Sequence, residues 1–103
     1  MAKIRVHVDP DLKEIVPGFL ENRKKDVLAL ANALQTQDFA TCKSIGHKMN
    51  GNSGGYGFHR LSEIGEVIEK ASANNNLYKI QSATRELESY LANLEVVYDS
   101  SAA

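Results

Sequence analysis

His47 is the side chain of this 103-residue chain whose setting best suits chemistry. It lies in a helical pattern in which Phe39, Cys42, Met49 and Ser53 recur at three- and four-residue steps and so mark a core stripe. A neutral imidazole on the wetter side of such a helix can offer one ring nitrogen as a nucleophile while the other donates an orienting hydrogen bond. His47 is therefore a candidate nucleophile, and a plain surface histidine is the alternative. The residues that share its side of the helix are Lys43, Ser44, Lys48, Asn50 and Gly51.

Gly51 leaves the ring of His47 accessible. On a helix, the neighbours of a side chain are the residues three and four positions away, and Gly51 is one of them. A glycine inside a helix costs about 1 kcal/mol relative to alanine, so helix stability does not explain its presence. Access to the imidazole is one explanation. The glycines from 54 to 57 are better explained by a helix end and by close approach of helices, because no strand or nucleotide-binding glycine motif precedes them.

Residues 47–58 resemble the phosphoacceptor motif of histidine-containing phosphotransfer (HPt) domains. That motif is usually written His-x-Leu-Lys-Gly-Ser-Ser, with a further glycine about a turn later. The residues here are His47-Lys48-Met49-Asn50-Gly51-Asn52-Ser53, followed by Gly54-Gly55-Tyr56-Gly57-Phe58. Segments 15–26, 33–39 and 61–65 are also similar to such domains, so the resemblance extends over about residues 9–98. It departs at one position, because Asn50 stands where the family commonly has lysine.

The resemblance implies that His47 accepts a phosphoryl group and that a polar side chain on the following helix orients its ring. Counting the family's separation from His47 leads to Glu69, the first candidate for the orienting residue, and Glu66 is the second. Helix phase agrees, because Ser62, Glu66 and Glu69 flank the core stripe of that helix on the edge that an antiparallel neighbour would turn toward His47. The alternative is that both glutamates are solvated surface charges.

The function implied is that of a phosphocarrier rather than a kinase. Its partners would be the receiver domains of response regulators and a hybrid histidine kinase, with the acidic pocket and Mg²⁺ on the receiver and no cofactor on this chain. Lys43 and Lys48 would then screen the charge of the arriving phosphoryl group, in part replacing the lysine missing at Asn50. A different class of function also fits, namely an interaction module that docks a kinase or receiver without being phosphorylated. Asn50 is the feature that keeps this alternative open.

Composition excludes several other functions. The length predicts one domain over residues 1–103, and the interspersed 12 basic and 13 acidic residues give a net charge of −1, which does not suit a nucleic-acid binder. The single cysteine, Cys42, falls on the core stripe and cannot form an intrachain disulfide, and no signal peptide or membrane-spanning run is visible. We expect a cytoplasmic monomer. Cys42, His47 and His59 have no metal-site spacing, and His7 and His59 read as surface residues.

The elements that position His47 are predicted to be helices. Residues 1–8 alternate apolar and basic side chains as a short extended lead, and Asp9-Pro10 starts a short helix to about Val16 that Pro17-Gly18 kinks or breaks. Long helices then follow over about 18–35, 39–52, 58–72 and 77–98, joined by short connections. This favours an all-α fold: an antiparallel up-down four-helix bundle over about 10–98, with a short extra N-terminal helix and flexible ends at 1–8 and 99–103. Gly46 and Gly65 fall on facing stripes and would allow a close helix contact.

Overall fold

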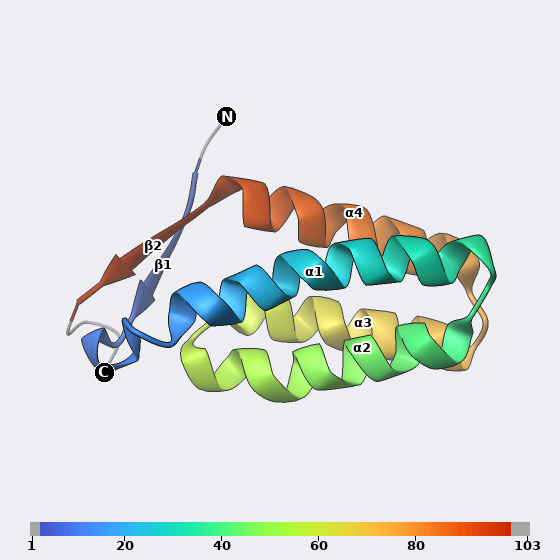
Figure 1. Ribbon diagram of the computed structural model, residues 1–103, viewed down its shortest axis with the longest axis horizontal. Helices are drawn as coiled ribbons and strands as arrows, with labels where there is room; N and C mark the ends of the chain where they lie inside the picture. Colours follow the sequence, from blue (N-terminus) through green and yellow to red (C-terminus); the bar gives the residue numbers. More distant parts are fainter. Residues whose placement is uncertain (1–2, 100–103) are drawn as a thin grey trace.

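The computed structural model describes residues 3–99 and arranges them as a helical bundle with a small sheet at one end (Figure 1). The described chain contains four α-helices, α1 (Val16–Gln35), α2 (Phe39–Ser53), α3 (His59–Ala73) and α4 (Leu77–Asn93). Two 3-10 turns, Pro10–Leu12 and Gly54–Tyr56, and two strands, β1 (Ile4–Val8) and β2 (Leu94–Tyr98), complete it. The helices lie side by side, and the chain reverses direction at each connection between them (Figure 1). Residues 1–2 and 100–103, the outermost parts of the expected flexible ends, lie outside the described residues.

The core lies between the helices along the apolar stripes that the sequence predicts. The stripe of α3 is buried along its length, and Cys42 of α2 is also fully buried, as expected of a small apolar side chain. On α1, Ala33 is buried and Ala31 is exposed. Within residues 3–99 no helix is long and apolar enough to cross a membrane.

Side chains and glycine set the helix ends. Asp38 caps α2 by accepting a hydrogen bond from the backbone N–H of Thr41 (3.1 Å), and Asn76 caps α4 through the N–H of Lys79 (3.2 Å). After α2, the 3-10 turn ends at Gly57, whose φ of 90° is a left-handed conformation that favours glycine. The glycine-rich segment is therefore the connection between α2 and α3.

Two glycines allow α2 and α3 to approach very closely. A Cβ atom on Gly46 would lie 2.7 Å from the backbone nitrogen of Glu69 and 2.8 Å from the carbonyl oxygen of Gly65. A Cβ atom on Gly65 would lie 2.6 Å from the backbone nitrogen of Asn50. No larger residue fits between these backbones without moving a helix. The prediction that Gly46 and Gly65 permit a close helix contact is confirmed.

The expected helical bundle is present, but it also carries a small sheet, and the expected end of the last helix is wrong. The helix predicted to run to Tyr98 ends at Asn93, and Leu94–Tyr98 forms β2, which pairs in parallel with β1 from Ile4↔Leu94 to Val8↔Tyr98. Leu94 and Tyr98 continue the helical spacing of α4, which is why the pattern misled. The β-branched and aromatic residues 96–98 suit a strand once a partner strand is present, and only the fold supplies that partner. Residues 4–8 of the expected flexible lead are that partner.

The predicted helix before Pro17 is also wrong in extent. A single 3-10 turn over Pro10–Leu12 stands where a helix to about Val16 was expected, with the side chain of Asp9 accepting a hydrogen bond from the N–H of Asp11 (2.9 Å). Pro17 does not kink a helix but lies in the first turn of α1, where its missing N–H costs no hydrogen bond. Pro17-Gly18 therefore marks the start of α1 and not a break in an earlier helix.

Candidate functional site

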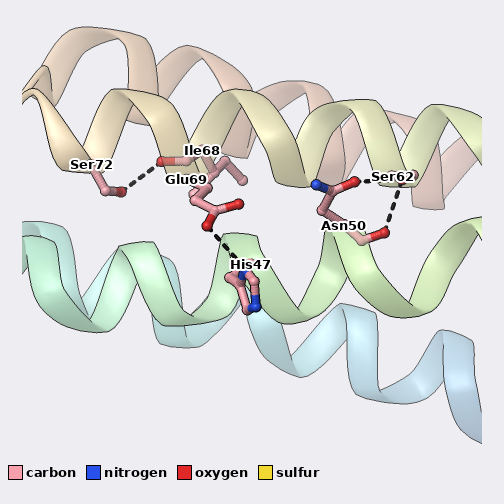
Figure 2. A network of polar contacts seen from close by, with 6 residues as sticks. All are labelled: His47, Asn50, Ser62, Ile68, Glu69 and Ser72. Carbon is pink, nitrogen blue, oxygen red and sulfur yellow. Dashed lines mark hydrogen bonds and ion pairs between the residues drawn. The ribbon is translucent and has the colours of Figure 1, made fainter.

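His47 projects from α2 toward α3, where Glu69 meets it (Figure 2). The Nδ1 atom of His47 lies 2.9 Å from Oε2 of Glu69. The side chain of His47 is 73% exposed, whereas that of Glu69 is 27% exposed. An ionised carboxylate only accepts hydrogen bonds, so this contact places the ring proton on Nδ1 and leaves the lone pair of Nε2 free. The arrangement presents an oriented, solvent-accessible imidazole nitrogen.

The close contact of α2 and α3 brings this pair together. Gly46 precedes His47 and packs against Gly65, which lies one helical turn before Glu69. Because the two backbones are this close, the short side chain of a glutamate spans the remaining distance to the ring. His47 and Glu69 are 22 positions apart in the sequence.

Glu66, the second candidate for the orienting residue, does not contact His47. Its Oε1 atom lies 2.7 Å from Nζ of Lys70, one turn along α3. The hydrogen bond and the charge of Lys70 lower the pKa of Glu66. Glu66 therefore belongs to an exposed ion pair on α3.

Asn50 is held by Ser62, a contact that the sequence did not predict. The hydroxyl of Ser62 lies 2.9 Å from the backbone carbonyl oxygen of Asn50 and 2.7 Å from its side-chain oxygen (Figure 2). Both residues are partly buried between α2 and α3. Helix phase had placed Ser62 on the edge that faces α2, but its partner could not be read from that signal. The side chain at the position of the family's lysine is therefore bonded to α3.

The other predicted site residues surround His47 on the exposed side of α2. Lys48 is close enough to Asp26 of α1 for its charge to act on that carboxyl. Burial raises the pKa of Asp26, while the charges of Arg23 and Lys48 act against that rise; Nε of Arg23 lies 2.8 Å from the carboxylate of Asp26. A Cβ atom on Gly51 would meet nothing within 4 Å. The predicted site residues of α2 that are exposed, besides His47, are Lys43, Ser44, Lys48 and Gly51.

The remaining histidines lie away from this site. His7 of β1 is exposed, and its Nδ1 atom lies 2.8 Å from the carboxylate of Asp99, a neighbour that the sequence reasoning missed. The two residues are 92 positions apart, and only the pairing of β1 with β2 brings them together. His59 is exposed at the start of α3. In the described part of the chain, no group of three or more His, Cys, Asp or Glu side chains could hold a metal ion.

Fold and site together define a helical-bundle protein in which an exposed helical histidine, His47, contacts a carboxylate of the neighbouring helix. The family model of the Hpt domain matches residues 14–101, and the chain therefore belongs to the Hpt domain family. Hpt domains are phosphotransfer modules of two-component signalling, where they act with receiver domains and histidine kinases. Comparisons with curated proteins and with solved structures gave no match.

Proposed function

We propose that this protein is a histidine phosphotransfer protein of a phosphorelay, which carries a phosphoryl group on His47 between the aspartates of receiver domains. The observation that carries the proposal is the 2.9 Å contact between Nδ1 of the exposed His47 and the carboxylate of Glu69. This contact leaves Nε2 as the nucleophilic nitrogen and directs it away from α3. The proposal takes the helices as an antiparallel up-down bundle, which the alternating course of the chain in Figure 1 supports.

In the proposed transfer, the lone pair of Nε2 attacks the phosphorus of an aspartyl phosphate on the receiver. The new N–P bond forms as the P–O bond to the aspartate breaks, and the aspartate leaves as a carboxylate. The proton on Nδ1 stays in place, so the phosphorylated ring carries a positive charge. The negative charge of Glu69 stabilises that charge and holds the ring in one orientation. Return of the phosphoryl group to another receiver reverses these steps.

The electrostatics around the phosphoryl group would come from both proteins. The receiver supplies the acidic pocket and Mg²⁺, and this chain supplies the oriented nucleophile without a cofactor of its own. Asn50 is bonded to Ser62, so Lys43 and Lys48 are the cations of α2 available to screen the phosphoryl charge. The chain acts as a phosphocarrier without kinase activity, as a monomer in the cytoplasm.

Transfer can be tested with a receiver domain charged by a small-molecule phosphodonor. Intact mass measurement of this protein after mixing should show the addition of one phosphoryl group. His47→Gln should keep the fold, because the side chain is largely exposed, and should lose the labelling, because an amide cannot replace the imidazole nucleophile. Labelling that persists in this variant would move the phosphoacceptor to His7 or His59 and overturn the proposal.

A second function is favoured by Asn50, which stands where the motif commonly has lysine. Its side chain is bonded to Ser62 of α3. In this alternative, the domain docks a receiver or a kinase without being phosphorylated. The same experiment separates the two functions. Docking observed by NMR line broadening, together with an unchanged mass for the wild-type protein, would support the interaction module.

A further inference from the structure

A groove lies at the sheet end of the bundle, and His47 is not among the residues that line it. It has a volume of about 710 Å³, within the range of roughly 300–1,000 Å³ that is typical of ligand sites. One wall is β1, from Ile4 to His7, and the opposite wall comes from Gly57, the first residues of α3 and the last turns of α4. None of these residues takes part in the proposed phosphoryl transfer.

The edge of β1, rather than one of its faces, lines this groove. Side chains of a strand alternate between two faces, so four consecutive residues from Ile4 to His7 can line one groove only along the strand edge. The carbonyl of Val8 accepts a hydrogen bond from the N–H of Asp99, which places the backbone groups of Val8, and by alternation those of Val6, on the side of β2. The backbone groups of Arg5 and His7 therefore point to the other edge.

The position of Gly57 also indicates that the carbonyl of His7 points away from β2. The carbonyl oxygen of His7 lies 3.7 Å from the place that a Cβ atom on Gly57 would occupy, so this carbonyl faces the α2–α3 connection and not β2. Within residues 3–99, the backbone of Arg5 makes no hydrogen bond outside the sheet. Gly57 closes one end of the groove, and the open part of the edge is centred on Arg5. An unpaired N–H and C=O on a strand edge form a template for an additional strand.

The side chains around the edge indicate the chemistry of the added strand. Arg5 is 71% exposed and forms an ion pair with the exposed Glu95, with 3.5 Å between Nε and Oε2; an ion pair this exposed contributes little to stability and is easily exchanged. Glu86, the carboxylate that lines the groove, bonds to Arg60. Arg5 is therefore the exposed cation over the edge, and an acidic side chain of an added strand can take the place of Glu95 beside it. On the other face of the strand, Tyr90 and Val6 offer apolar contacts.

We propose that β1 and this groove bind an extended, acidic peptide segment of a partner protein by strand addition. Alternate side chains of the peptide would be acidic, toward Arg5, and apolar, toward Tyr90. A single extended chain suits the site better than a second copy of this protein, because α3 and α4 form the opposite wall and a folded copy would bring its own helices against them. The binding is independent of phosphoryl transfer at His47.

The test is a selection of displayed random eight-residue peptides on the full protein, followed by measurement of the selected peptides in solution. Arg5→Pro removes the outward N–H without removing a β1–β2 hydrogen bond, whereas the matched Arg5→Ala removes the charge and keeps the N–H. Selected peptides should alternate acidic and apolar residues and should bind Arg5→Pro at least about tenfold more weakly than wild type, with a smaller loss in Arg5→Ala. Binding should also slow hydrogen exchange of the Arg5 amide. Phosphoryl transfer to His47 from a charged receiver should be the same in both variants as in wild type.

A variant on the other wall keeps the test decisive if Arg5→Pro fails to fold. Ser89 is exposed on α4 and lines the groove, so Ser89→Trp fills the space without altering β1. It should abolish peptide binding while the circular dichroism of the helices is retained. No enrichment of peptides on the wild-type protein, or equal binding by the Ser89→Trp variant, would overturn the proposal. So would dimerisation through this edge, seen as concentration-dependent sedimentation that Ser89→Trp abolishes.

Discussion

His47 and Glu69 differ in their access to solvent, and this difference suits a transfer between two proteins. The imidazole is largely exposed and can enter a partner's pocket, while the carboxylate behind it is more covered and stays bonded to Nδ1. A contact of this kind fixes the ring without occupying the nitrogen that reacts. Glu69 and His47, the proposed orienting residue and nucleophile, come from different helices, so the geometry of their contact depends on how α2 and α3 pack.

Substitution of Glu69 should separate the effect of its charge from the effect of its hydrogen bond. Glu69→Gln keeps an acceptor for Nδ1–H and should slow single-turnover transfer less than tenfold, whereas Glu69→Ala releases the ring and should slow it about 10–100-fold. Nitrogen chemical shifts of the ring in NMR spectra should show one tautomer in wild type and a mixture in Glu69→Ala. Unchanged shifts and rates in both variants would mean that Glu69 does not orient His47.

Gly51 offers a test of access to the ring. The space around its Cα is open, so Gly51→Leu should fold and should be as stable as wild type or more stable, since leucine is the better helix former. The new side chain lies one turn from His47 and should obstruct the receiver, which slows transfer by about tenfold or more. Thermal unfolding and transfer rates measured on the same protein give both quantities. Full transfer activity in a stable Gly51→Leu protein would remove Gly51 from the site.

The α2–α3 pair shows which parts of the structure could be predicted from sequence. The stripe of α3, the glycine connection and the facing glycines Gly46 and Gly65 all follow from helical periodicity and residue size. The separation between His47 and Glu69 was taken from the resemblance to HPt domains, and helix phase agreed with it by placing Glu69 on the edge that faces α2. The bond from Ser62 to Asn50 could not, because helix phase gives the edge on which a side chain lies but not the atom that it meets.

The closeness of α2 and α3 should make Gly46 intolerant of any side chain. Gly46→Ala places a Cβ atom against the backbone of both Glu69 and Gly65, which can only be relieved by moving a helix, and should cost about 1–3 kcal/mol of unfolding free energy or more. Gly51→Ala, in open space on the same helix, is the matched control and should be neutral or stabilising by up to about 1 kcal/mol. Urea unfolding of both variants measures the two changes. Equal stabilities would show that the helices do not touch at Gly46.

The two ends of the described chain form a sheet that packs on the helices, and local sequence patterns could not show it. Each strand is five residues long and reads as an extended lead or as a continuation of α4. What decides their structure is the pairing of residues about 90 positions apart, as in Ile4↔Leu94. Val8 is buried in the same core as the helices, so sheet and bundle share one core.

A substitution at Val8 should therefore weaken the whole protein. Val8→Ala removes two methyl groups from the core and should lower the free energy of unfolding by about 2 kcal/mol, with the helical circular dichroism and a tyrosine signal from Tyr98 melting together. Ile4→Ala, at the exposed end of the same strand, is the control and should have a smaller effect. A normal helical melting temperature in Val8→Ala would mean that the sheet is a separate unit.

The parallel pairing of β1 with β2 also has a consequence for synthesis of the chain on the ribosome. β1 leaves the ribosome before the helices, but its partner, Leu94–Tyr98, is made only after α1 to α4. The α2–α3 hairpin, whose contacts span few residues, can form as soon as residue 73 has emerged. During translation, β1 is therefore an apolar and basic segment that cannot pair with β2 until Leu94–Tyr98 has emerged. Until then, its edges are open to chaperones.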